Sequence, residues 1–233
     1  MNSREAILGR IQEALRVPAA PPSEHNHGHD GGSGRHGPLS GTQGMQAWLP
    51  LVPSGADGQL ALFQKNCTML RTELHVVSGQ EEARQTLAAV RDAHHWTRAA
   101  VHRNELLDAV VPSLQLEMLY TEQRPDAAAL ETCSVGITAC DALVAQTGSI
   151  LLTARSAGGR SLSVLPPHHV VVARGDQLVP DLPAAFDLLK SRYGFRYPSF
   201  TTLITGPSRT GDIERILVLG AHGPKNLTIV LMR

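Results

Sequence analysis

The stretch ELHVVSGQEEARQTLAAVRDAHHWTRAAVH, residues 73–102, contains the pattern that decides the fold. It opens with an apolar, β-branched run at Glu73–Val77, which predicts a strand. Ser78-Gly-Gln-Glu81 has the form of a helix capping box, and helical periodicity continues to residue 92. Ala99–His102 is a second short apolar run. A strand, a helix and a strand in this order indicate an α/β fold with parallel strands.

The same alternation extends in both directions along the chain. Helices are expected at residues 57–70, 104–110 and 126–131, and strands at 116–120, 134–138, 149–154, 169–173, 201–205, 216–219 and 227–232. Residues 141–145 are expected to form a short helical or turn segment. Asp181 is expected to cap a helix that buries Leu182, Phe186 and Leu189. The predicted class is α/β, with a Rossmann-like mixed or parallel sheet and flanking helices.

The chain divides by composition into three segments. Residues 1–17 predict an amphipathic helix, residues 18–44 a disordered linker rich in Gly, Pro and His, and residues 45–233 the α/β domain. Four histidines lie in the linker: His25, His27, His29 and His36. They can chelate a metal or act as a titratable spacer, and the lack of ordered partners favours the spacer.

Charge and cysteine content exclude several classes of protein. Lys and Arg number 21, as do Asp and Glu, so the chain has no basic field to attract nucleic acid. Its three cysteines form no CxxC pair, which argues against a disulfide framework and against a cysteine-ligated zinc or iron–sulfur site. No apolar run is long enough to span a bilayer, and the N-terminus lacks a signal peptide pattern. We therefore expect a cytoplasmic protein.

Four loops in the last hundred residues, three of which contain glycine, are the candidate ligand-binding segments. Asp141 follows a predicted strand, where a carboxylate caps backbone N–H groups or binds a ligand hydroxyl. The Gln146-Thr147-Gly148 turn offers donors to an anion, or is simply a tight turn that requires glycine. Arg160 beside a Gly-Gly pair can clamp a carboxylate, or belong to a solvated surface loop.

The remaining loops are also rich in hydrogen-bond donors. The third contains a proline pair and then His168, which titrates near neutral pH and can exchange protons or donate. The fourth, residues 205–214, has an anion-binding composition but no P-loop or GxGxxG pattern, and residues 220–224 close the same edge. The full candidate set is Asp141, Gln146, Thr147, Gly148, Arg160, Ser161, His168, Gly206, Ser208, Arg209, Thr210, Asp212, Glu214, His222 and Gly223. The residues themselves indicate no catalytic motif and no metal site.

These segments together resemble the LUD domain family. The similarity is carried by GITACDALVAQTGS at 136–149, LPPH at 165–168, VPD at 179–181, TGPSRTGDIE at 205–214 and LGAHGP at 219–224. The resemblance implies a fold like that of the NagB/RpiA/CoA-transferase superfamily. It also implies a role in oxidising L-lactate to pyruvate, with iron–sulfur clusters on partner proteins and no cofactor on this chain.

One position departs from the family pattern, which usually has Glu where this chain has Gln146. An amide is neither a useful nucleophile nor a base, so we expect this position to bind rather than react. The leading hypothesis is a non-cluster subunit in which Arg160 or Arg209 pairs with a small organic acid, and Ser208, Thr210 and Thr147 donate hydrogen bonds. The alternatives are a stand-alone enzyme of the same superfamily and a regulatory or scaffolding module.

Overall fold

A computed structural model describes residues 49–194, 196–210, 218–219 and 222–233. The predicted helix at 1–17, the predicted linker at 18–44, and the candidates Asp212 and Glu214 lie outside the described residues. The division of the chain into three segments therefore stays a prediction.

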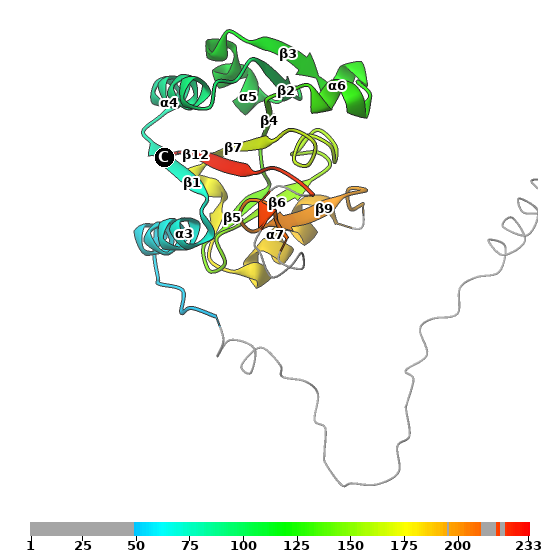
Figure 1. The fold of residues 1–233 in the computed structure, drawn as a ribbon. Helices are drawn as coiled ribbons and strands as arrows, with labels where there is room; N and C mark the ends of the chain where they lie inside the picture. Colours follow the sequence, from blue (N-terminus) through cyan, green and yellow to red (C-terminus); the bar gives the residue numbers. More distant parts are fainter. Residues whose placement is uncertain (1–48, 195, 211–217, 220–221) are drawn as a thin grey trace, which may run out of the picture. The chain divides into compact units, whose positions relative to one another are not determined.

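The centre of the domain is a six-stranded sheet in which every neighbouring pair is parallel (Figure 1). Its strands, in spatial order, are β1 (Glu73–Val77), β12 (Asn226–Met232), β7 (His168–Arg174), β4 (Val135–Thr138), β2 (Arg98–Val101) and β3 (Glu117–Tyr120). The inner strands are buried on both faces, which is why β7 and β12 are almost continuously apolar.

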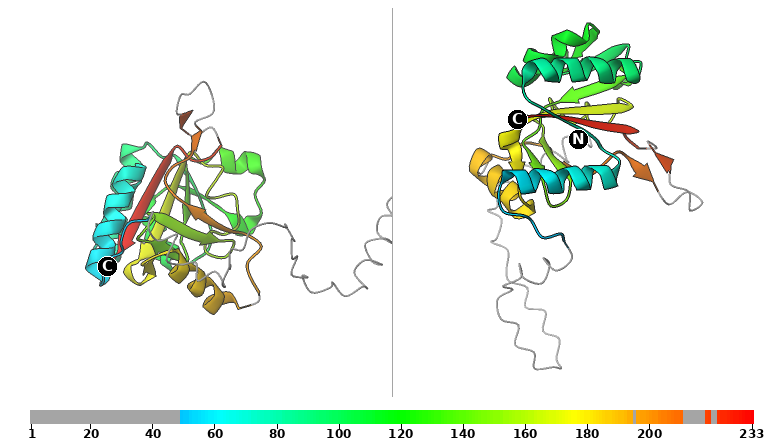
Figure 2. Two further views of the ribbon diagram at one scale, coloured as in Figure 1. Left: turned by 90° about the horizontal axis from the view of Figure 1, so that it is seen from below. Right: turned by 90° about the vertical axis from the view of Figure 1, so that its left-hand side faces the viewer.

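Helices cover both faces of this sheet, as the side view in Figure 2 shows. On one face lie α4 (Gln80–Ala93) and α5 (Glu105–Val110), whose buried residues pack against Val170, Val172 and Val230. On the other lies α3 (Ala56–Leu70), with Phe63 packed against Val171 and Ile229. A short helix, α6 (Ala127–Glu131), precedes β4.

The strands of the second half form a separate, smaller sheet rather than extending the first. Its order is β8 (Leu178–Val179), β5 (Ala142–Val144), β6 (Ser149–Thr153) and β9 (Thr201–Ile204), and it contains antiparallel pairs. It packs between the α3 face of the large sheet and helix α7 (Leu182–Tyr193). Strand β10 (Arg209–Thr210) pairs antiparallel with β11 (Val218–Leu219). The predicted α/β class with a parallel sheet and flanking helices is confirmed.

Three local predictions are wrong. Residues 142–144 form strand β5 instead of a helical or turn segment. Phe186 is 55% exposed, because α7 turns Ala185 and Leu189 toward the small sheet instead. The N-cap of α4 is Gly79, and the Ser78 amide and hydroxyl both donate to the carboxylate of Glu82 rather than to Glu81.

Candidate functional site

The order of the strands places a crevice at the centre of the large sheet. From β2 the chain runs outward to β3, and then returns to β4 on the other side of β2. Where the winding direction reverses, the loops after neighbouring strands separate and leave room for a ligand at their carboxyl ends. Asn104, just after β2, and Asp141, just after β4, both line a cavity at this point.

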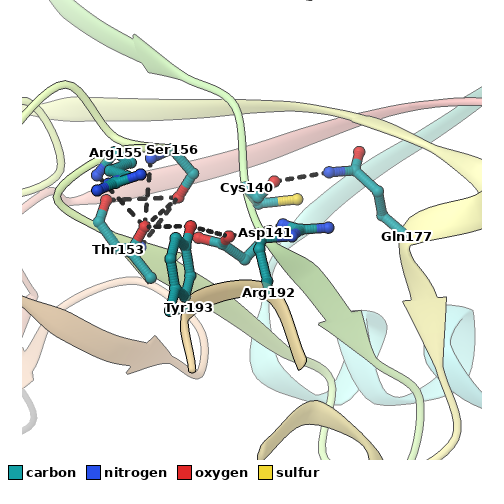
Figure 3. Close-up of polar contacts among 8 residues, drawn as sticks. All are labelled: Cys140, Asp141, Thr153, Arg155, Ser156, Gln177, Arg192 and Tyr193. Atoms are coloured by element: carbon teal, nitrogen blue, oxygen red, sulfur yellow. Dashed lines mark hydrogen bonds and ion pairs between the residues drawn. The ribbon is translucent and has the colours of Figure 1, made fainter. Parts of the chain in front are cut away.

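Asp141 forms the centre of a buried polar network at this crevice (Figure 3). Its side chain is completely buried, and Oδ1 accepts hydrogen bonds of 2.7 Å from both Arg192 Nη1 and the Tyr193 hydroxyl. Both donors come from the last turn of α7. The Tyr193 hydroxyl also lies 3.3 Å from the Thr153 hydroxyl at the end of β6. The network thus joins the large sheet, the small sheet and α7.

The carboxyl group of Asp141 is held in its charged form. Burial alone would raise its pKa, but the hydroxyls of Ser156, Tyr193 and Thr153 and the Arg192 guanidinium outweigh this and lower it. The other oxygen, Oδ2, is buried and accepts no hydrogen bond from the described residues. A charged oxygen in that state is poised to accept a further hydrogen bond.

The cavity beside this network, which we call the Asp141 pocket, has a volume of about 290 Å³. Three arginines line it: Arg155, Arg174 and Arg192. Arg192 is paired with Asp141, and Arg174 lies 3.4 Å from the exposed Asp176. Within the described ranges, Arg155 forms no ion pair. A guanidinium group at the mouth of a small cavity favours a carboxylate or phosphate ligand.

A larger cavity of about 590 Å³ adjoins the Asp141 pocket along the same edge of the sheet. The two share the walls formed by Glu105, Leu106 and Arg174. The larger cavity is mostly apolar where Leu60 and Leu231 line it, so the polar contacts for a small ligand are concentrated in the Asp141 pocket.

The side chains of the candidate turn after β5 contact other parts of the protein. Gln146 is buried, and its Nε2 donates to the carbonyl oxygen of Pro50 over 3.0 Å. Gly148 has φ 66°, and a Cβ there would lie 2.8 Å from atoms of both Asn66 and Leu70. The Thr147 hydroxyl is buried with no partner among the described residues. The alternative of a tight turn that requires glycine explains this segment.

The two arginines expected to clamp a ligand instead contact backbone carbonyls. Arg160 Nη2 donates to the Ser199 carbonyl over 2.9 Å, and Arg209 donates to the carbonyl of Leu70. The Ser161 carbonyl accepts hydrogen bonds in its own turn, and Thr210 of β10 pairs with Val218 of β11. The structure therefore does not place these residues with Asp141, and a ligand role for them stays a prediction.

Four other candidates do meet, at the opposite edge of the sheet. Gly206, Ser208, His222 and Gly223 line a cavity of about 320 Å³ near the start of β7 and β12. His169, which the candidate set did not include, also lines it. Its Nδ1 is buried without a partner in the described chain, and burial lowers its pKa to about 3.

His168 points to the other face of the sheet from His169. It is buried, accepts a hydrogen bond from Trp96 Nε1, and lies close to Glu73 and His94. Glu73, His94 and His168 are far apart along the chain and follow no known motif spacing, so the sequence alone does not indicate that they lie close together. Arg155, Arg192 and Tyr193 were missed for the same reason, since a basic residue in the last turn of a helix is common without any ligand.

The comparisons with known proteins agree on one family. Residues 60–232 match the LUD domain. Lactate utilization protein C of Anoxybacillus flavithermus is 31% identical over 179 residues, which cover 74% of this chain and 80% of the relative. The protein of the same name from Bacillus velezensis is 29% identical over 200 residues, covering 76% and 78%.

A solved structure has the same fold. The crystal structure of a DUF162 family protein from Deinococcus radiodurans aligns with a TM-score of 0.64 and 22% identity, covering 78% of this chain and 100% of that chain. No helix formed by the described residues combines the length and the apolar character that crossing a bilayer requires. Because the domain match extends from residue 60 to residue 232, the chain belongs to the LUD domain family.

Proposed function

We propose that this chain is a subunit of an L-lactate-oxidising system and binds a small organic acid in the Asp141 pocket. The observation that carries the proposal is the set of three arginines around a cavity of about 290 Å³ at the switch point of the sheet. The names of the relatives supply the pathway, since each is a Lactate utilization protein C.

The pocket favours a 2-hydroxy acid over other small acids. Arg155 offers a planar pair of donors to the carboxylate, and the charged Asp141 carboxylate, which lies at the wall of the pocket, is the acceptor nearest to the 2-hydroxyl group. Pyruvate has an oxygen acceptor at that position, which the charged Asp141 repels. Propionate has no hydroxyl to donate. L-Lactate is therefore the expected ligand of the three.

The redox groups belong to partner proteins in this proposal. Conversion of L-lactate to pyruvate releases two electrons and two protons, which an electron acceptor must take up. The cysteines of this chain do not suit an iron–sulfur cluster, because Cys133 lies in a different core cluster from Cys67 and Cys140, and no group of three potential ligands among the described residues includes a cysteine. Burial raises the pKa of all three thiols, which keeps them protonated in the absence of a metal. We therefore assign the clusters to partner subunits.

Calorimetric titration of the full chain with L-lactate, propionate and pyruvate tests the ligand. We expect saturable binding of L-lactate, and a loss of about 10-fold or more in affinity for Arg155→Gln, because a hydrogen bond to a charged group is worth about 1.5–3 kcal/mol. Arg103→Gln is the matched control, since Arg103 pairs with Asp108 and is not among the residues that line the pocket. Equal affinity for L-lactate and propionate would contradict the role given to Asp141.

Purification of the tagged chain from cells grown on L-lactate tests the partners. Iron–sulfur proteins that copurify with lactate-oxidising activity support the subunit proposal. If the chain is recovered alone and turns over a substrate by itself, the stand-alone enzyme is the better explanation.

A further inference from the structure

Three potential metal ligands converge at the amino edge of the large sheet, opposite the Asp141 pocket. Glu73 opens β1, His168 opens β7, and His94 is the C-cap residue of α4. One ligand atom from each lies within 4.8 Å of those from the other two. Their positions, 21 and 74 residues apart, hide this arrangement from the sequence.

The contacts around the three side chains direct them toward one point. Glu73 Oε2 lies 3.7 Å from His94 Nε2. The Thr228 hydroxyl lies 2.8 Å from Glu73 Oε2 and 2.8 Å from His168 Nε2, so it bridges these two atoms, and an ion that binds both replaces these hydrogen bonds. The His94 and His168 rings meet edge to face with centroids 4.5 Å apart.

The surroundings also suit a bound cation. His75 Nε2 lies 2.8 Å from Glu73 Oε1, which orients the carboxylate in the way that outer-shell partners orient metal ligands. His168 is buried and forms the inner side of the cluster. Glu73 and His94 are exposed, which leaves the ion a path from solvent.

We propose that Glu73, His94 and His168 bind one divalent transition-metal ion of the zinc class. Two imidazole nitrogens and one carboxylate oxygen are a donor set that zinc accepts, and three protein ligands leave a position for water. The ion connects β1, α4 and β7, and so stabilises the α4 side of the domain. It lies across the sheet from the Asp141 pocket, so its presence does not depend on the proposed lactate role.

Trp96 opposes this binding and provides a sharp test. Its Nε1–H donates to His168 Nδ1 over 3.3 Å, which places the ring hydrogen on Nε2, facing Thr228. Coordination through Nε2 moves that hydrogen to Nδ1, where it faces the indole N–H. Trp96→Phe removes this conflict, so we expect it to tighten metal binding several-fold.

The test is a Co²⁺ titration of the full chain in which His25, His27, His29 and His36 are replaced by Asn, so that the linker histidines do not bind the metal. We expect one equivalent of Co²⁺ to give a visible absorption spectrum of low coordination number and to quench tryptophan fluorescence. Zn²⁺ should displace Co²⁺ and raise the thermal midpoint. Glu73→Gln, His94→Gln and His168→Gln should each weaken binding at least 10-fold.

His95→Asn is the matched control, because His95 is the exposed neighbour of His94 and lies in the left-handed region, which Asn tolerates. It should bind Co²⁺ like the parent chain. Circular dichroism checks that each variant is folded, and His94→Gln keeps the test decisive because that exposed change leaves the core intact. Absence of stoichiometric Co²⁺ binding in the folded parent, or unchanged binding in His94→Gln, would overturn the proposal. None of these measurements depends on lactate binding, so the metal proposal and the lactate proposal can fail separately.

Discussion

The ion pair between Asp141 and Arg192 predicts an asymmetry in stability. The Asp141 side chain is 0% exposed, whereas the Arg192 side chain is 44% exposed. Arg192→Met leaves a charged carboxylate buried without its cation. Asp141→Asn leaves a guanidinium that turns toward solvent, while the amide oxygen still accepts from Tyr193. We therefore expect Arg192→Met to be the more destabilising change.

The size of the effect follows from the geometry of the pair. Removing one partner of a fully buried pair costs about 3–5 kcal/mol. The partial exposure of Arg192 and the remaining hydroxyl donors reduce this, so we expect about 2–3 kcal/mol for Arg192→Met. At about 2–4 °C per kcal/mol for a chain of this size, the thermal midpoint falls by about 4–12 °C. Asp141→Asn should cost about 1–2 kcal/mol.

Urea unfolding at pH 7 measures both changes. The double variant should be less destabilised than the sum of the single variants by about 1 kcal/mol or more, because the two residues are in contact. Arg103→Met is the control, since its exposed pair with Asp108 and its contact with the Tyr120 ring are each worth about 1 kcal/mol or less. An Arg192→Met variant as stable as Arg103→Met, or more stable than Asp141→Asn, would refute the reasoning.

Three further predictions concern pH and the buried turn. The folded-state pKa of Asp141 lies below its unfolded value of about 3.9, so the stability that the charged carboxylate contributes is fully present above that pH and is lost as the pH falls through the folded pKa. When the free energy of unfolding is measured at decreasing pH, Asp141→Asn should therefore lose less stability than the parent chain. Gly148→Ala forces a Cβ to 2.8 Å from α3 atoms at a positive φ and should destabilise by about 2 kcal/mol or more in urea, whereas Gly175→Ala, whose Cβ has no contact under 3.5 Å, should stay within about 0.5 kcal/mol. Gln146→Glu replaces the donor to the Pro50 carbonyl with an acceptor and should lower stability at pH 7 by about 1–2 kcal/mol; an unchanged urea midpoint would show that this bond contributes nothing.

The fold was largely predictable because the apolar residues of its strands and of its helices recur with different periods. The strand at Glu73–Val77 and the caps of α5 and α7 by Asn104 and Asp181 follow local rules and are confirmed. Strand β5 was missed because Ala142–Val144 is a three-residue run buried on both faces, which has no alternation to separate it from a helix.

The candidate site was predictable only in part. Asp141 was identified because it directly follows a strand, and the structure places it at the switch point. Its partner Arg192 lies 51 residues away and meets it only because α7 packs against the small sheet. The same tertiary packing turns Arg160 and Arg209 toward backbone carbonyls, which no local pattern indicates.

Growth on L-lactate tests the central claim most directly. A strain of the source organism that lacks this chain is complemented with the parent sequence, Arg155→Gln or Arg103→Gln, each expressed to the same level. The account predicts that the parent and Arg103→Gln restore growth on L-lactate and Arg155→Gln does not, while all three grow equally on a carbon source that bypasses lactate. Full growth of the Arg155→Gln strain on L-lactate would contradict the assignment of the Asp141 pocket.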